Sequence, residues 1–488
     1  MPTLSQLYRN RPSARDLWVL AAFAVIFWGL RLIYWRTTYE PPYADIVEYV
    51  RVARRIVQDF TFASGDQFYA DWTPVTPSVI AVAMVLGGAH FELVFRFLVQ
   101  GVCFAATLLL AFEIIKLTGR KWHGATLLFA VALSRPSIFW SLKLGTEAVN
   151  EALLIGSIGL VLHALRTRSL PAAAFAGAIC LLLALNRPQN FPSVVLVALC
   201  FGLSALVPMA RAAWRQRNSS LPARRHLSAA SDRRRAGQAA CFVAAAALMW
   251  SPWLVRNYLH FGGIVPFSTS GYYVFIWEYG GAPIRTGAYQ ELTLDNGVVI
   301  REFGLLPLRA ELHKAPDDLA RQSILRKIAV AWFKANWAEL PWLMAARLKK
   351  FISQSGANGL TIVPRYPIFI PTPQPDLNIP AEPLLDLFLF DKSPLLWFAA
   401  VGAVVLLTVR HGVAGATVLS LWLTPWLFLT LLIGYERTVE SMISLTVWLA
   451  IYFGSEIVLR LSPARADRGQ RDGGGRMGAD GGRDGGDR

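Results

Sequence analysis

Residues 16–35 read DLWVLAAFAVIFWGLRLIYW, an apolar run that is long enough to decide the class of fold. As an α-helix, these residues span about 30 Å, the thickness of the hydrocarbon core of a bilayer. Similar runs recur along the 488 residues, which are 54% hydrophobic and only 16% charged. A soluble protein carries about 25% charged residues. The sequence predicts an all-α polytopic membrane protein, because only helices satisfy the backbone of such runs in lipid.

The charges and cysteines argue against two classes of function. The net charge of +16 suits a nucleic-acid partner, but the arginines cluster between apolar runs and at both ends of the chain. The positive-inside rule gives that distribution for a membrane protein, so we expect no nucleic-acid partner. The seven histidines have no metal-ligand spacing, and no CxxC pair occurs, so neither a zinc site nor a disulfide framework is predicted. All the cysteines lie in apolar runs: Cys103, Cys180, Cys200 and Cys241.

The first apolar run sets the orientation of the chain. Arg9, Arg11 and Arg15 precede it, so we expect the N-terminus in the cytoplasm and the segment after the run on the outer side. The run lacks a small-residue cleavage site at its end. This favours an uncleaved first span over a signal peptide.

Residues 75–90, VTPSVIAVAMVLGGAH, are apolar but short, and they contain Pro77 and two glycines. If they crossed the membrane, every later span would be inverted. Basic stretches follow the apolar runs 93–115, 148–165 and 189–210, and all three face the cytoplasm only if residues 75–90 do not cross. We therefore expect a helix that lies at the outer surface or partly in it.

The apolar runs predict about ten transmembrane helices with both ends of the chain in the cytoplasm. The predicted spans are residues 16–35, 93–115, 122–140, 148–165, 170–185, 189–210, 237–255, 391–409, 411–433 and 438–460. The chain then divides into a cytoplasmic leader (1–15), an N-terminal transmembrane module (16–255) with a long first external loop (36–92), an external subdomain (256–390), C-terminal helices (391–460) and a tail (461–488). The tail is expected to be disordered, because Gly, Arg and Asp dominate it and it cannot bury a core.

The first external loop carries two carboxylates close to the membrane surface. In PPYADIVEYVRVARRI, residues 41–56, Asp45 shares a helix face with Tyr49 and Ala53, and Glu48 lies beside Asp45. A carboxylate in this place suits proton abstraction from a hydroxyl group. Two plainer interpretations stay open: Asp45 caps the helix, and Glu48 is solvated on the free helix face.

Arginines mark four different external loops, although cationic residues normally avoid the outer face. Each one alone can be read as an anchor at the membrane interface. Together they suit the binding of a phosphate, to which Arg donates two parallel hydrogen bonds. These arginines are Arg135, Arg187, Arg256 and Arg437, and the same loops add Glu147 and Asn257.

Six short motifs follow one another over residues 15–460. They read ADIVEYVRVARRI, WTPVTPSVIAVAMVL, RPSIFWSLKLGTEAVNEALL, LALNRPQNFP, PWLVRNYLHFGGIVPFSTSG and YERTVESMISLTVWLA, and the fifth is the most specific. This ordered set resembles the GT-C superfamily of membrane glycosyltransferases. The resemblance is to its bacterial branch, akin to dolichyl-phosphate-mannose protein mannosyltransferases and aminoarabinose lipid A transferases. It implies a GT-C-type helical bundle.

The resemblance also implies an activity. A hexose or pentose is transferred, usually with inversion, from a polyprenyl-phosphate donor to a glycolipid, polysaccharide or protein acceptor. Transfer takes place on the outer, periplasmic face of the inner (cytoplasmic) membrane. The catalytic aspartate of the first loop is then Asp45, and the acidic residue of the second loop is Glu147. Arg437, Arg187 and Arg256 would neutralise the leaving phosphate, and Glu48, Tyr49 and Asn257 would complete the substrate site.

The sequence departs from the family in two places. Many members carry an adjacent acidic pair in the first loop, whereas here Ile46 and Val47 separate Asp45 from Glu48. Asp45 and Glu147 alone make a thin cation site, so we expect no metal and no other cofactor. The segment GYERTVES also lacks the aromatic residue and the proline expected after its arginine.

Two other functions stay open. A lipid-linked sugar flippase or transporter would need ionisable residues near the middle of the bilayer and paired broken helices, whereas the charges lie mainly at span ends and no repeat is visible. A non-catalytic member of the family would explain the separated acidic residues.

Overall fold

The computed structural model is a bundle of long helices. It describes residues 13–38, 45–63, 70, 72–218, 225–269, 314–316, 318–339, 341, 394–428 and 442–461. Within these ranges the regular structure is helical throughout and contains no strand. The bundle consists of α2 (Ala14–Thr37), α5 (Phe91–Thr118), α6 (Lys121–Ala132), α7 (Arg135–Ser141), α8 (Thr146–Thr167), α9 (Leu170–Asn186), α10 (Phe191–Asn218), α11 (Arg225–Phe261), α18 (Pro394–His411), α19 (Val413–Phe428) and α20 (Ile443–Leu461).

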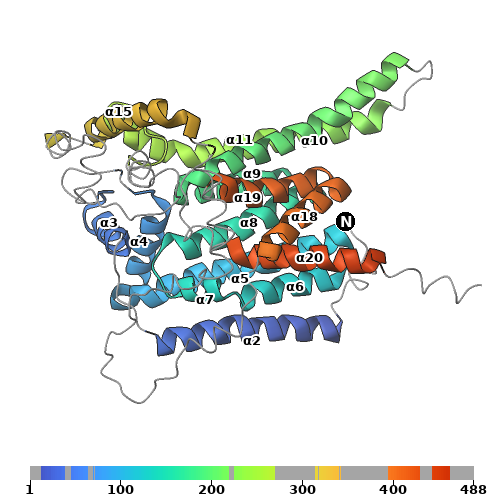
Figure 1. Cartoon of the computed structure of the whole chain (residues 1–488), viewed down its shortest axis with the longest axis horizontal. Helices are drawn as coiled ribbons and strands as arrows, with labels where there is room; N and C mark the ends of the chain where they lie inside the picture. The colour runs from blue at the N-terminus through green and yellow to red at the C-terminus, as the bar shows by residue number, and fades with distance from the viewer. Residues whose placement is uncertain are drawn as a thin grey trace, which may run out of the picture.

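Three further helices lie at one end of this bundle. They are α3 (Asp45–Asp59), α4 (Val75–Gly87) and α15 (Asp318–Asn336), all at the left in Figure 1. We call this end the Asp45 end. At the opposite end, Lys121 at the start of α6 pairs with Asp16 at the start of α2, 2.6 Å away. We call it the Lys121 end. At the Asp45 end, Asn186 at the end of α9 bonds to Thr76 of α4 and to Thr146 at the start of α8.

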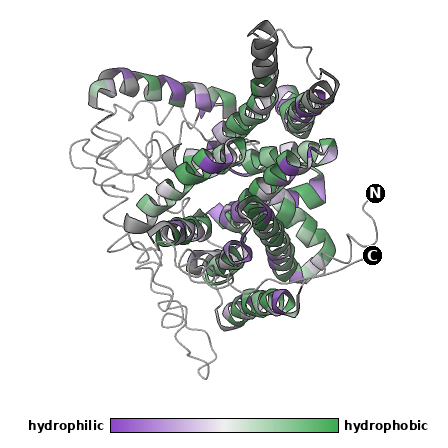
Figure 2. Ribbon diagram, turned by 90° about the vertical axis from the view of Figure 1, so that its right-hand side faces the viewer, coloured by the Kyte–Doolittle hydropathy of each residue, from purple (hydrophilic) through white to green (hydrophobic). Residues whose placement is uncertain are grey.

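Apolar packing holds the long helices together. Helix α9 packs against α8 and α11, α5 packs against α8, and α18 packs against α19 and α20. The hydropathy colouring of Figure 2 shows apolar residues along most of these helices, with the polar ones scattered among them. Large apolar side chains also remain exposed on the outside, including Leu248 and Val25. Such a surface suits contact with lipid.

Among the described residues, five helical segments are long and apolar enough to cross a membrane. They are Ala14–Thr37, Val75–Thr118, Thr146–Thr167, Pro188–Val207 and Arg233–Phe261. Shorter apolar helices cover Leu170–Asn186, Trp397–His411, Val413–Thr424 and Ile443–Leu459. These nine segments fall on nine of the ten predicted spans. The multi-pass architecture is thus supported, while the number of ten crossings stays a prediction.

The tenth predicted span, residues 122–140, is divided into α6 and α7. Pro136 lies at the N-terminus of α7 and has no N–H to continue a helix from α6. Ser134 caps the new helix by accepting a hydrogen bond from the Ser137 N–H. The break at Leu133 and Ser134 is therefore encoded in the SRPS sequence.

The predicted surface helix at residues 75–90 is present as α4. It is separated from α5 by a short 3-10 turn (Gly88–His90) that begins with Gly88 at a φ of +51°, which only glycine adopts without strain. Its 13 residues span about 20 Å, less than the hydrocarbon core. Helix α4 packs against both α3 and α5. Its position relative to the bilayer stays a prediction.

A part of the segment predicted to form an external subdomain lies within the described residues. Helix α15 confirms the helix expected at residues 317–336. Most of the second expected helix, 338–353, lies outside the described residues, as do the leader up to residue 12 and the tail from residue 462.

A buried guanidinium joins α2 to the rest of the bundle. Arg31 is fully buried, and its Nε donates to Gln100 Oε1 over 2.7 Å. Its Nη2 donates to Ser137 Oγ over 2.6 Å, and its guanidinium stacks on the Phe27 ring. Glu151 on α8 is buried near enough for its charge to act on Arg31, and it accepts a hydrogen bond from Ser444 on α20 over 2.8 Å.

Replacing Arg31 tests this connection. Arg31→Ala leaves the polar groups of α5, α7 and α8 buried without their partner, so we expect the free energy of unfolding to fall by about 3 kcal/mol. The measurement is equilibrium unfolding in mixed micelles. Arg36→Ala is the matched control, because Arg36 is exposed in the last turn of the same helix. Equal stability of the two variants would contradict a role for Arg31 in the packing.

Candidate functional site

Helix α3 presents one face to the bundle. Ala53 is fully buried, and Tyr49 is nearly so, with its ring edge-on to Trp72 at a centroid distance of 5.1 Å. Asp45 begins the same helix, on the same face and half-buried. Its carboxylate lies in the first turn of α3, where the helix dipole favours a negative charge.

Glu48 lies elsewhere. Its carboxylate pairs with the guanidinium of Arg51, one turn further along α3, at 3.0 Å. The side chain of Arg51 is 55% exposed, so this ion pair is on the outer side of the helix. The structure thus places Tyr49, but not Glu48, among the residues that face the bundle. The proposed role of Glu48 toward a substrate stays a prediction.

A buried ion pair marks the start of α8. Glu147 is 1% exposed, and its Oε1 lies 2.8 Å from Nη2 of Arg187, which follows α9. The hydroxyl of Thr146 accepts hydrogen bonds from Nε and Nη2 of Arg187, at 3.0 and 2.7 Å. Arg187 has an extended backbone, as expected for a residue before a proline, and so α9 ends at Asn186. The RP dipeptide thereby directs the guanidinium back to the start of α8.

Gly145 makes room for this carboxylate. It is the N-cap of α8, and a Cβ at this position would lie 2.6 Å from Oε2 of Glu147. A side chain here would require the Glu147 carboxylate to shift. The sequence GTE therefore encodes the position of the carboxylate.

Asn186 fixes α4 to this ion pair. Its amide Oδ1 accepts from Thr76 Oγ1 over 2.7 Å, and its backbone carbonyl accepts from Thr73 Oγ1 over 2.8 Å. Its Nδ2 donates to the carbonyl of Thr146 over 3.0 Å. Because α3 packs on α4, this arrangement connects the helix of Asp45 to the Glu147–Arg187 pair.

Arg256 and Asn257 hold loops together near the end of α11. Arg256 donates to the carbonyl of Phe62 over 2.5 Å and to Oδ1 of Asn257 over 2.7 Å. Asn257 is fully buried and donates to the carbonyl of Val265 over 2.8 Å. These two predicted binding residues therefore join the segment after α3 to the segment after α11, and each makes structural contacts within the protein.

Two other predicted positions cannot be placed. Arg437 lies outside the described residues, and so does the side chain of Arg135. Lys143, in the same loop as Glu147, is buried with its ammonium 4.0 Å from the centre of the Phe139 ring. Among the described residues, no group of three or more His, Cys, Asp or Glu could hold a metal ion. The expectation of a metal-independent site stays a prediction.

Several residues around the Glu147–Arg187 pair were not predicted from the sequence. Thr73, Thr76 and Asn186 carry no charge, and only their pairing in space shows their role. Asn190, which donates to Asn150 over 2.8 Å, belongs to the same group. Glu151 could have been found, because a carboxylate inside an apolar span indicates a functional or structural partner.

A double-mutant cycle measures the buried pair. Arg187→Ala leaves Glu147 buried without its cation, and we expect a loss of about 3 kcal/mol in the free energy of unfolding. The double variant with Glu147→Ala should lose less than the sum of the single changes, by at least about 1 kcal/mol. The matched control is the exposed Glu48–Arg51 pair, for which about 0.5 kcal/mol of coupling is expected. Additive effects at Glu147 and Arg187 would show that the pair is not formed.

Comparisons with known proteins give structural neighbours only. No family model matches the chain, and no curated protein matches its sequence. The structure is similar to the archaeal oligosaccharyltransferase AglB from Archaeoglobus fulgidus in complex with an inhibitory peptide and a dolichol-phosphate, with a TM-score of 0.46 and 14% identity over 95% of this chain and 52% of that one. The apo form of the Archaeoglobus fulgidus oligosaccharyltransferase gives a TM-score of 0.48, with the same identity and coverage.

The likeness is one of fold. The chain spans about half the length of the solved structures that it matches.

Proposed function

We propose that the protein is an integral membrane glycosyltransferase. It moves a hexose or pentose from a polyprenyl-phosphate donor to an envelope glycolipid, polysaccharide or protein acceptor, on the outer face of the cytoplasmic membrane. The observation that carries the proposal is the buried pair of Glu147 and Arg187, which is connected through Asn186 and α4 to the helix that Asp45 begins. Burying charges in an apolar bundle is unfavourable, and such sites are commonly functional.

The proposed reaction is a displacement at the anomeric carbon. The acceptor hydroxyl oxygen forms a bond to this carbon while the bond to the phosphate oxygen breaks, which inverts the configuration. Asp45 takes the hydroxyl proton, because a carboxylate at the substrate is suited to general-base catalysis. The electron pair of the broken bond leaves with the lipid phosphate, which needs cations at the place where its charge develops.

Arg187 has one guanidinium nitrogen, Nη1, that is available to donate a hydrogen bond to a ligand. Its Nε and Nη2 are engaged by Thr146 and Glu147, whereas its Nη1 is buried and has no hydrogen-bond partner in the part of the chain that the structure describes. Such a donor is costly to bury unless a ligand accepts from it. We assign Nη1 to the donor phosphate, with Arg437 as the second cation. Glu147 positions Arg187, and Arg256 positions the loops.

Replacement of Asp45 tests the proposal. Asp45→Asn should lower the rate of sugar transfer by at least about 100-fold, because general-base catalysis contributes that much or more. The measurement is mass spectrometry of lipids that co-purify with the protein, followed by turnover of the polyprenyl-phosphate sugar that is found. The Asp45→Asn variant should retain the polyprenyl-phosphate sugar that the parent protein consumes. Asp59→Asn is the control, since Asp59 is exposed at the end of the same helix.

The proposal fails under a defined result. If neither form retains a polyprenyl-phosphate sugar, and neither consumes one that is supplied, the protein does not use this donor. If Asp45→Asn transfers at the rate of the parent, Asp45 is a helix-terminal carboxylate without a catalytic role.

One observation favours a second candidate, a lipid-linked sugar flippase. Arg31 and Glu151 are buried within the bundle, one to two turns inside the ends of α2 and α8, and buried ionisable residues line many transport pathways. Movement of a lipid-linked sugar in sealed vesicles, without covalent transfer, would support that candidate. Transfer without movement supports the glycosyltransferase.

The proposed orientation has its own test. The Asp45 end faces the outside, and the Lys121 end with both termini faces the cytoplasm. Lys334→Cys, on the exposed surface of α15, should react with an impermeant maleimide in intact cells. Lys121→Cys should react only after the cells are opened, and the parent protein corrects for Cys241, the one native cysteine that the structure leaves partly exposed. Labelling of position 121 in intact cells would invert the topology.

A further inference from the structure

A cavity lies at the Asp45 end, and its lining does not include Glu147 or Arg187. Its volume is about 470 Å³, which is in the range of sites for small molecules. Its walls come from three separate segments of the chain: Pro188 after α9, the loop 264–268 after α11, and α15. Pro188, which lines the cavity, directly follows Arg187 in the chain.

The loop wall is rigidly held. Three consecutive backbone carbonyls of this loop, at residues 265, 266 and 267, accept hydrogen bonds from side chains of α11, whose donors are Asn257, Trp250 and Trp253. Further along the loop, the Thr269 N–H donates to the Ala70 carbonyl over 2.8 Å. The ring of Phe267 packs between Phe191 and Trp250. A wall that is fixed before a ligand arrives reduces the loss of conformational entropy on binding.

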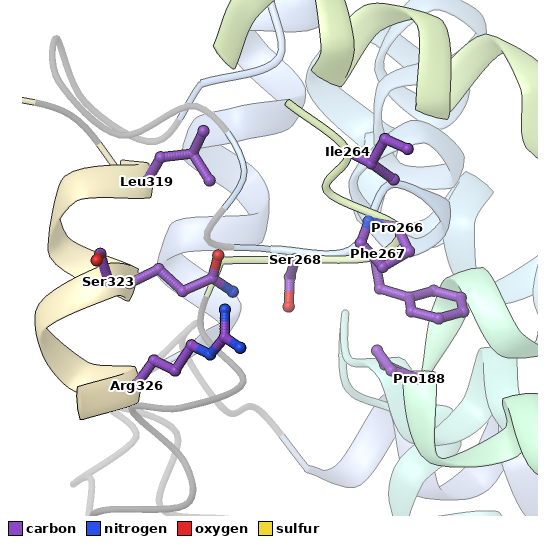
Figure 3. Close-up of a pocket in the computed structure, with 9 residues that line it drawn as sticks. Pro188, Ile264, Pro266, Phe267, Ser268, Leu319, Ser323 and Arg326 are labelled. Carbon is purple, nitrogen blue, oxygen red and sulfur yellow. The ribbon is translucent and has the colours of Figure 1, made fainter. Parts of the chain in front are cut away.

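The helix wall is a single face of α15. Leu319, Gln322, Ser323 and Arg326 line the cavity, and their spacing of i, i+3, i+4 and i+7 places them on one side of a helix. Figure 3 shows the Arg326 side chain extending from α15 into the space between this helix and Ser268. Arg326 is exposed, and no described carboxylate pairs with it.

The chemistry of the lining selects an acidic sugar. A guanidinium binds a phosphate or carboxylate through charge-assisted hydrogen bonds, and the amide and hydroxyl groups of Gln322, Ser323 and Ser268 can bond to ring hydroxyls. Phe267 and Pro188 offer apolar surface, against which the C–H face of a sugar ring can pack. A cation, several neutral hydrogen-bonding groups and an apolar face thus meet in one cavity.

We propose that this cavity binds an acidic sugar unit, a ring that carries a phosphate or a carboxylate. Its place as part of the acceptor rests on the proposed transferase function. The acceptor would then be an acidic glycan, and Arg326 would hold its anionic group while a neighbouring hydroxyl reaches the donor site. Binding itself does not depend on transfer and can be measured alone.

The test is a binding measurement on the full chain in phosphatidylcholine nanodiscs. Glucose 6-phosphate is the probe, with glucose and inorganic phosphate as the neutral and ring-free comparisons, and saturation-transfer NMR or calorimetry gives the Kd. Arg326→Gln should weaken the binding of glucose 6-phosphate by about tenfold or more, the usual effect of losing a charged hydrogen bond. Lys327→Gln, the matched loss of charge at the next, exposed residue, should stay within about twofold.

Each outcome decides the proposal. An unchanged Kd in Arg326→Gln overturns it, as does inorganic phosphate that binds as tightly as glucose 6-phosphate, which would mean a simple anion site. Gln322→Ala provides a second variant, expected to weaken both glucose 6-phosphate and glucose. Asp45→Asn should bind the probe like the parent. If Asp45→Asn abolishes sugar transfer while Arg326→Gln leaves the binding of glucose 6-phosphate unchanged, this inference is overturned and the proposed function stands. If the binding of glucose 6-phosphate depends on Arg326 but the protein has no transfer activity, the binding site stands and the proposed function is overturned.

Discussion

A polar group that is buried among apolar helices must find its partner inside the protein, and the Asp45 end is organised by this constraint. Asn186 meets it most completely, because its amide and its carbonyl bond to Thr73 and Thr76 at the start of α4 and to Thr146 at the start of α8. Leaving one of these groups unpaired would cost about 1–3 kcal/mol. The pairing therefore fixes α4, α8 and α9 relative to one another, and with them the Glu147–Arg187 pair.

The Lys121 end meets the same constraint by different means. Glu456 on α20 is buried and accepts from both Arg120 and Arg410. Glu113 on α5 is paired with Arg166 and His163 on α8. These clusters contain acids and bases in close contact and adjoin no described cavity, so they join helix ends. At the Asp45 end, by contrast, Arg326 lines a cavity and Arg187 has a spare donor, which is why the site is assigned there.

The sequence predicted the helical bundle well, because apolar runs of membrane length have few alternative structures in lipid. It also placed Glu147 and Arg187 in neighbouring loops on the same side, since charge at the span ends fixes the direction of each helix. It could not show that these two side chains pair. Nor could it show that Arg256 and Asn257 donate hydrogen bonds to the carbonyls of Phe62 and Val265. Such contacts join residues up to 194 positions apart, which local sequence patterns do not reveal. Pro136 marks the division of the span at 122–140, whereas the length of the apolar run predicts one continuous helix. The uncharged Asn186 gave no signal beyond its neighbour Arg187.

The partners of Arg31 have a consequence for how the chain enters the membrane. Gln100 and Ser137 lie 69 and 106 residues further along the chain, so the ribosome makes α2 long before it makes the groups that satisfy its guanidinium. An unpaired arginine within a span disfavours insertion, by about 2.5–3.5 kcal/mol at the centre of the helix and by less toward its end, where Arg31 lies. The surrounding apolar residues of α2 must outweigh that penalty, or the helix must wait at the membrane interface until α5 and α7 have emerged. Biogenesis of this protein is thus tied to the order in which its helices are synthesised.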